Sequence, residues 1–209
     1  DEFFDVLRDD PIDRWYEIGN VITVVDAKLE SELSDEADYL LASEAANAGC
    51  IVLSRSQEAE DEEIENTVAH LNHAMEKVQC KRRFQNEIII KDWETFGHGD
   101  YEKLLSCGYV SENYRKMHIE EGETFKSLYF MNLDKTKDEI TEAAEKVLED
   151  RECGKVFRVK GFLKDKEEKW LELNATHQEI RTVPIPEGQE VVIVIGEEMN
   201  EAKIRGYFS

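Results

Sequence analysis

Polar side chains follow two short apolar runs of the chain, at the points where both runs end. Residues 21–25 (VITVV) lead directly into Asp26, and residues 50–53 (CIVL) lead into residues 54–57 (SRSQ). Ligands of open α/β sheets bind at the carboxyl ends of the strands. The pattern therefore predicts a ligand-binding loop at residues 54–57. The alternative, an ordinary polar loop between a strand and a helix, stays open.

Two histidines could bring their imidazoles onto one cation. His70 and His73 have the i, i+3 spacing that places both on one side of the helix predicted over residues 61–79. They point away from the apolar stripe of that helix, so we expect both to be exposed. Cys80 follows on a similar side, about 10 Å along the axis. Because structural zinc usually takes four ligands, the pattern indicates only a weak, adventitious metal site.

The four cysteines are scattered, without the paired spacing of a disulfide framework, which is typical of a reducing compartment. Cys107 and His118 are further weak metal candidates. The simpler interpretation is a buried thiol and a surface imidazole. Cys50 and Cys153 are expected in the core. No nucleophile signature such as G-x-S-x-G is present, and we identify no catalytic residue.

Helices and strands must position these side chains, and the first three elements that the sequence predicts are a strand, a helix and a strand. A helix over residues 35–48 separates the two apolar runs, with Ser34 as its N-cap and Gly49 as a left-handed C-terminal residue. This order predicts a parallel crossover. The helix over residues 61–79 carries an apolar stripe, and residues 87–90 follow as a third strand. The stripe consists of Ile64, Val68, Leu71, Met75 and Val78.

A different pattern fills the rest of the chain. Residues 125–131 predict a strand, and a helix capped by Asp134 or Thr136 runs to residue 149. Four strands follow, and residues 199–207 predict a last helix. The strands are expected over residues 156–163, 169–175, 179–183 and 190–195.

The predicted fold is thus an α/β half-domain followed by an α+β domain, with helices on one face of a mainly antiparallel sheet. We place the first domain at residues 1–105, a linker at 106–123 and the second domain at 124–209.

The charge of the chain limits its partners. Acidic residues number 48 and basic residues 26, and the formal net charge is −22. Such a surface repels nucleic acids and anionic membranes. It could attract cations, including metal ions, but a well-solvated surface is the simpler interpretation. No apolar run approaches the roughly 20 residues of a membrane helix, no signal peptide is visible, and we expect a cytoplasmic protein.

Two stretches of the chain resemble the CobW family of P-loop GTPases, which is linked to cobalamin synthesis and to delivery of cobalt and zinc. Residues 19–27 (GNVITVVDA) and 48–54 (AGCIVLS) look like the second half of the family's GTPase domain. Residues 125–130 (FKSLYF), 156–163 (VFRVKGFL) and 191–196 (VVIVIG), together with Trp170, look like its C-terminal domain. Together they span nearly the whole chain.

The resemblance implies a fragment of a metallochaperone GTPase. Neither the phosphate loop G-x-x-x-x-G-K-[ST] nor the family's Cys-x-Cys-Cys motif occurs here, and both precede these strands in the family. We therefore expect the chain to be a C-terminal portion that binds no cofactor and hydrolyses no GTP alone. GTP, magnesium and zinc or cobalt are expected for the parent protein. The expected partners are a metalloprotein client, the protein's own N-terminal half, or a second copy at the open sheet edge.

The resemblance also assigns the loop at residues 54–57 to the guanine base, where the family has [NT]-K-x-D. Its aspartate accepts hydrogen bonds from guanine, whereas the amide of Gln57 offers one acceptor and one donor. We expect this departure to weaken selectivity for GTP over ATP. The aligned residues are Ser54, Arg55, Ser56 and Gln57.

Two other functions remain open at this stage. One is a stand-alone interaction module that docks a client through its second domain without any nucleotide. The other is metal storage or sensing through His70, His73 and Cys80.

Overall fold

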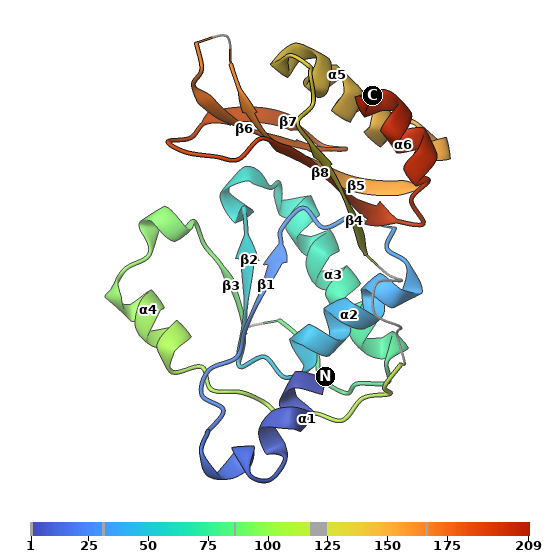
Figure 1. Ribbon diagram of the computed structural model, residues 1–209. Coiled ribbons are helices and arrows are strands. Elements are labelled where there is room, and N and C mark those ends of the chain that lie inside the picture. The colour runs from blue at the N-terminus through green and yellow to red at the C-terminus, as the bar shows by residue number, and fades with distance from the viewer. Residues whose placement is uncertain (1, 31, 86, 118–124, 166) are drawn as a thin grey trace. The chain divides into compact units, whose positions relative to one another are not determined.

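The computed structural model describes residues 2–30, 32–85, 87–117, 125–165 and 167–209 (Figure 1). The chain divides into two compact units, Asp1–His118 and Ile119–Ser209. The linker predicted at residues 106–123 lies partly outside the described residues, as does His118. Each unit is treated by itself below. Among the described residues, no helix has both the length and the apolar character to cross a membrane.

A three-stranded parallel sheet organises the first unit. Its strands are β1 (Ile22–Asp26), β2 (Cys50–Ser54) and β3 (Ile88–Ile90), in the order β1-β2-β3. Val24 lies opposite Val52, and Val52 lies opposite Ile89. The predicted parallel crossover is therefore confirmed. The helices of this unit are α1 (Glu2–Arg8), α2 (Asp35–Ala46), α3 (Asp61–Lys77) and α4 (His98–Leu105). Single 3-10 turns are η1 (Ile12–Arg14), η2 (Ser56–Glu58) and η3 (Trp93–Thr95).

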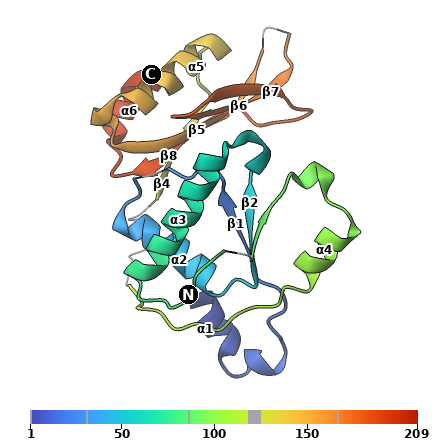
Figure 2. The ribbon, with the colours of Figure 1, turned by 180° about the vertical axis from the view of Figure 1, so that it is seen from behind.

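Helices α2 and α3 cover one face of this sheet (Figure 2). The Ser34 hydroxyl accepts a hydrogen bond from the Ala37 backbone, so the predicted N-cap of α2 is confirmed. In α3 the apolar stripe meets the core through its later members, since Leu71 and Met75 are fully buried while Val68 is only half-buried.

The opposite face of the sheet is apolar and exposed. Ile22 is 42% exposed and Val24 62% exposed, although both lie in a strand whose alternate residues Thr23 and Val25 are buried. Parallel sheets are ordinarily buried on both faces. The first unit therefore displays one apolar sheet face that nothing in the described part of the chain buries fully.

Gly49 corrects one prediction. Helix α2 ends at Ala46 with Asn47 in a right-handed conformation, and Gly49 is not among the residues with positive φ. Glycine is needed here because another backbone segment approaches closely. A Cβ at Gly49 would lie 2.2 Å from the Gly108 carbonyl oxygen and 2.4 Å from that of Cys107.

The second unit is a five-stranded antiparallel sheet in the order β4-β8-β5-β6-β7. Its helices α5 and α6 lie on the same face of the sheet (Figures 1 and 2), as predicted. The strands are β4 (Lys126–Met131), β5 (Lys155–Lys164), β6 (Trp170–Thr176), β7 (Ile180–Pro184) and β8 (Val191–Glu197). The helices are α5 (Lys137–Glu149) and α6 (Glu201–Phe208), with a 3-10 turn η4 at Arg151–Cys153.

Of the two residues that could cap α5, Thr136 does so. Its backbone N–H and its hydroxyl both donate to Glu139 Oε2, at 2.8 and 2.6 Å, in a capping box. The core beneath α5 and α6 contains Ile140 and Val147, and the rings of Phe130 and Phe208 have centroids 4.8 Å apart.

The close approach at Gly49 generates a prediction. We expect Gly49→Ala to lower the free energy of unfolding by about 3 kcal/mol, because the added methyl group must push backbone atoms apart. Gly19→Ala is the control, since a Cβ there meets no atom within 4 Å. Chemical denaturation of both variants checks this, and equal stabilities would contradict it.

Candidate functional site

The carboxyl ends of β1 and β2 bring Asp26 and Ser54 together, opposite each other in the sheet register. The Ala27 backbone N–H donates to the Ser54 carbonyl oxygen at 2.9 Å, which extends the pairing one residue past the strand. The Ser54 hydroxyl donates to the Val25 carbonyl oxygen at 3.3 Å. Both side chains thus lie at the carboxyl ends of the strands, where α/β proteins bind ligands.

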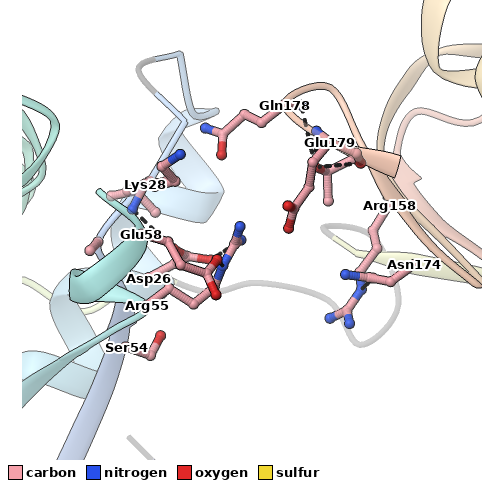
Figure 3. A network of polar contacts seen from close by, with 12 residues as sticks. Asp26, Lys28, Ser54, Arg55, Glu58, Arg158, Asn174, Gln178 and Glu179 are labelled. Carbon is pink, nitrogen blue, oxygen red and sulfur yellow. Dashed lines mark hydrogen bonds and ion pairs between the residues drawn. The ribbon is translucent and has the colours of Figure 1, made fainter. Parts of the chain in front are cut away.

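Arg55 occupies the centre of this edge (Figure 3). Its backbone is left-handed, with φ 58° and ψ 20°. Its Nη1 lies 3.2 Å from Asp26 Oδ2, and its Nε lies 3.1 Å from Glu58 Oε2. The guanidinium is therefore oriented by two carboxylates, and its charge is more than compensated.

Ser56 and Gln57 follow within the turn η2. Ser56 is half-buried, whereas Gln57 is exposed. The four residues predicted as a base-binding loop therefore form one continuous segment at the end of β2. The structure tests neither their affinity for a nucleotide nor their preference for a base, and that assignment stays a prediction.

Thr67 of α3 is a residue of this region that the sequence analysis missed. Its hydroxyl donates to the Ala27 carbonyl oxygen at 2.8 Å and accepts from the Leu29 backbone N–H at 3.3 Å. Its side chain is buried, and it holds the segment after β1 against α3. A polar residue directly before Val68 on the apolar stripe was the signal that could have identified it.

Lys28 completes the segment after β1. Its backbone N–H donates to Asp26 Oδ1 at 2.9 Å, and its Nζ lies 3.7 Å from Glu63 Oε2 at the start of α3. Asp26 is thus held from two sides, by Lys28 at one oxygen and by Arg55 at the other.

Of the two histidines on α3, only one is exposed as predicted. His70 Nε2 lies 2.7 Å from Asp38 Oδ1, and the His70 side chain is only 17% exposed. His73 is exposed, as expected. The prediction that His70 is exposed was wrong. The sequence pattern of α3 alone does not show that α2 packs beside it and brings Asp38 to the imidazole.

Asp38 is itself buried, with 3% of its side chain exposed, and it contacts two cationic or polar partners on α3. Its Oδ2 lies 2.7 Å from Lys77 Nζ, which also lies 2.7 Å from Asp35 Oδ1. Hydrogen bonds to Asp35 and then Asp38 raise the pKa of Lys77. The hydrogen bond from Lys77 lowers the pKa of Asp35. This cluster of ion pairs joins α2 to α3. His70 therefore has a structural role here, because its imidazole contacts Asp38.

The four cysteines, of which Cys80 and Cys107 were metal candidates, differ in burial. Cys80, Cys50 and Cys153 are buried, and Cys107 is half-buried rather than buried as the simpler interpretation expected. His118 lies outside the described residues. Within the part of the chain that the structure describes, no group of three or more His, Cys, Asp or Glu side chains could hold a metal ion.

In the second unit, the sheet face opposite α5 and α6 carries polar and aromatic groups. Arg158 Nε donates to Asn174 Oδ1 at 2.6 Å across β5 and β6 (Figure 3). Lys160 Nζ lies 2.9 Å from Glu172 Oε1 on the same pair of strands. Tyr129 at the edge of the sheet is exposed. This face therefore carries paired polar and charged groups rather than a buried apolar layer.

No protein-family model matches the chain, and no curated protein matches it. Two solved structures are similar: the Zn(II)-bound YjiA GTPase from E. coli, at 18% identity and TM-score 0.37, and a Zn(II)-bound triple mutant of the YjiA GTPase, at 16% identity and TM-score 0.36. In both cases the similarity covers 99% of this chain and 65% of the other. The chain therefore spans somewhat less than two thirds of the length of these structures, and similarity at this level does not determine a family.

The cluster around Asp38 generates a prediction. Asp38→Ala removes a buried carboxylate from two partners, and we expect the free energy of unfolding to fall by about 3 kcal/mol. Asp35→Ala is the matched control, because Asp35 contacts the same Lys77 atom but is 77% exposed. Exposed ion pairs contribute little, so that variant should remain nearly as stable as the parent chain. Equal losses in urea denaturation would show that burial of Asp38 is not the cause.

Proposed function

We propose that this chain is part of a longer metal-handling GTPase related to the CobW family. In this proposal the first unit supplies the base-side portion of a nucleotide domain, and the second unit docks a client. The observation that carries it is the parallel sheet of the first unit, which ends in a polar loop and exposes one apolar face. The sequence resemblance supplies the family.

The exposed apolar face of the sheet is evidence for a further layer of protein in the nucleotide domain. Ile22 and Val24 project from β1, and β1 and β3 are both edges of the sheet. Burial of apolar surface contributes roughly 25 cal/mol per Å², so helices and strands covering this face would add substantial stability. We propose the protein's own N-terminal half as the occupant. For this chain alone we propose that a second copy pairs with an open edge of the same sheet. Light scattering at micromolar concentration tests this.

The loop after β2 supports a nucleotide as the ligand. Ser54, Arg55, Ser56 and Gln57 follow the strand at the position where the resembled family reads guanine. Asp26 and Glu58 orient the Arg55 guanidinium, whose planar face suits a purine ring. Gln57 is exposed and offers its amide to the base edge.

The remaining parts of the proposed activity follow from the family. Magnesium, the phosphates and zinc or cobalt would bind to portions of the protein that precede β1, in a cytoplasmic protein. GTP binding and hydrolysis would change the orientation of the two units and thereby control transfer of the metal to a client. The second unit would contact that client, a metalloprotein, through the sheet face bearing Tyr129 and Arg158.

A second candidate function is a client-docking module that needs no nucleotide. The observation in its favour is the ion pairing of Arg55 with both Asp26 and Glu58, which closes the loop on itself without a ligand. Under this alternative, affinity for a client would not change when GTP is added.

Nucleotide and metal binding to the full-length protein test the proposal. If GTP controls metal transfer, replacing GDP by GTP with magnesium should change zinc affinity at least about fivefold, and zinc should change the ratio of GTP affinity to GDP affinity by the same factor. Competition with a zinc chelator measures the first effect, and titration of a fluorescent GTP analogue, with GDP as competitor, measures the second. The present chain alone should release no phosphate from GTP above a buffer blank. Zinc and GTP affinities that are independent of each other would refute the proposed coupling.

Gln57 generates a separate prediction. In the full-length protein, Gln57→Asp should raise the preference for GTP over ATP about tenfold or more, because a carboxylate accepts two charge-assisted hydrogen bonds from guanine. Gln85→Asp is the control, since Gln85 is exposed and lies before β3, at the other end of the sheet. The ratio of the two dissociation constants is measured by competition. If the ratio is unchanged in Gln57→Asp, the proposal that this loop contacts the base is wrong.

A further inference from the structure

Two cysteines that are far apart in the sequence lie side by side in the first unit. Ala48 and Tyr109 form an isolated antiparallel bridge. Cys50 lies two residues after Ala48, and Cys107 lies two residues before Tyr109. Continuing the antiparallel register therefore places Cys50 opposite Cys107.

Backbone contacts fix the same neighbourhood independently. The Val21 carbonyl oxygen accepts a hydrogen bond from the Gly49 backbone N–H at 2.8 Å and lies 3.8 Å from Cys107 Sγ. The Val21 backbone N–H in turn donates to the Gly108 carbonyl oxygen at 2.9 Å. Val21, directly before β1, thus joins the segment before Cys50 to the segment around Cys107.

The geometry suits a disulfide. Residues directly opposite each other in an antiparallel pair have Cα atoms roughly 4.5–5.5 Å apart, and disulfides span roughly 4.4–6.8 Å. The absence of a side chain at Gly49 allows the two segments to approach this closely. Both thiols are free in this structure.

The two thiols differ in their environment. Cys50 is buried, whereas Cys107 is half-buried. Burial, followed by the hydrogen bond and the charge of Cys107, raises the pKa of Cys50 to about 11. Cys107 is therefore the thiol that a reagent reaches from solvent, and Cys50 is the thiol that it meets second.

We propose that Cys50 and Cys107 form a redox-active dithiol that closes reversibly to an intramolecular disulfide. The oxidant is a low-molecular-weight disulfide such as oxidised glutathione. The bond fastens the first residue of β2 to the segment that follows α4. Since Ser54 lies at the other end of β2, this site is separate from the proposed nucleotide loop and does not depend on it.

The reaction proceeds in two exchange steps. The Cys107 thiolate attacks one sulfur of oxidised glutathione, the sulfur–sulfur bond breaks, and one glutathione thiolate leaves and takes a proton from solvent. Cys50 then loses its proton to solvent, and its thiolate attacks Cys107 Sγ and displaces the second glutathione. Two protein thiols are oxidised by two electrons in total, and one glutathione disulfide is reduced to two thiols.

A metal site is the less fitting interpretation of the same pair. Structural zinc usually takes four ligands, and no third His, Cys, Asp or Glu joins the pair in a group that could hold a metal within the described residues.

Oxidation of the unmodified chain tests the proposal directly. The chain is incubated with oxidised glutathione, the remaining thiols are alkylated, and peptides are mapped by mass spectrometry without reductant. We expect one intramolecular cross-link between the peptides of Cys50 and Cys107, with Cys80 and Cys153 alkylated only after unfolding. Closure should accelerate from about pH 7 to 9, because a thiol with a raised pKa yields more thiolate as pH rises.

A thermal measurement gives a second readout. The bond closes a loop of roughly 60 residues, so the oxidised chain should unfold about 5–15 °C higher than the reduced chain, and dithiothreitol should reverse this shift. Cys107→Ser should abolish both the cross-link and the shift, whereas Cys80→Ser should retain them.

Three results would overturn the proposal. One is a glutathione adduct on Cys107 that persists without closing. Another is a dimer linked through Cys107 of two chains. The last is alkylation of both thiols after oxidation, with no cross-link. Because these results come from the unmodified chain, they do not depend on whether any cysteine variant folds.

Discussion

Burial of one face of the parallel sheet is the constraint on which the first unit depends. Parallel strands cannot be joined by tight turns, so each connection must cross the sheet, and here both crossovers place their helices, α2 and α3, on the same face. That arrangement buries Ile51 and Leu53 completely and leaves Ile22 and Val24 on the opposite face. The exposed apolar face is a consequence of this arrangement.

The helices that form this layer are also joined to each other by charge. Asp38 is buried where α2 meets α3, which is tolerable only because Lys77 and His70 both contact its carboxylate. Thr67 connects α3 to the segment after β1 in a similar way, because its hydroxyl donates to the Ala27 carbonyl oxygen and accepts from the Leu29 backbone N–H. The position of Asp26 at the sheet edge therefore depends on α3 as much as on β1 itself.

The second unit has its own core, and its chemistry differs from that of the first. Its antiparallel sheet needs only one covered face, and α5 and α6 supply that cover. The other face can then carry Arg158, Asn174, Lys160 and Glu172, which pair across β5 and β6. The first unit thus exposes an apolar face, while the second unit carries a polar face whose groups pair across β5 and β6.

Much of the fold follows from the sequence by itself. Apolar runs of strand length, the periodic stripe of α3 and the caps Ser34 and Thr136 determine which segments become strands and helices, because these signals act between residues close in the chain. The chain order of strands and helices also predicts one parallel and one antiparallel sheet. The loop after β2 was predicted for the same reason, since it follows directly from where a strand ends.

Only the tertiary structure determined which side chains of different helices, strands and loops contact one another. The helical period places His70 away from the stripe of α3, but a second helix covers that side and brings Asp38 to it. Gly49 looked like a helix terminator, whereas the approach of Gly108 from far along the chain is what excludes a side chain there. The pairing of Cys50 with Cys107 could not be predicted from spacing, because it depends on an isolated bridge between Ala48 and Tyr109. Local pattern determines the elements through short-range backbone preferences, and long-range packing determines the contacts between them.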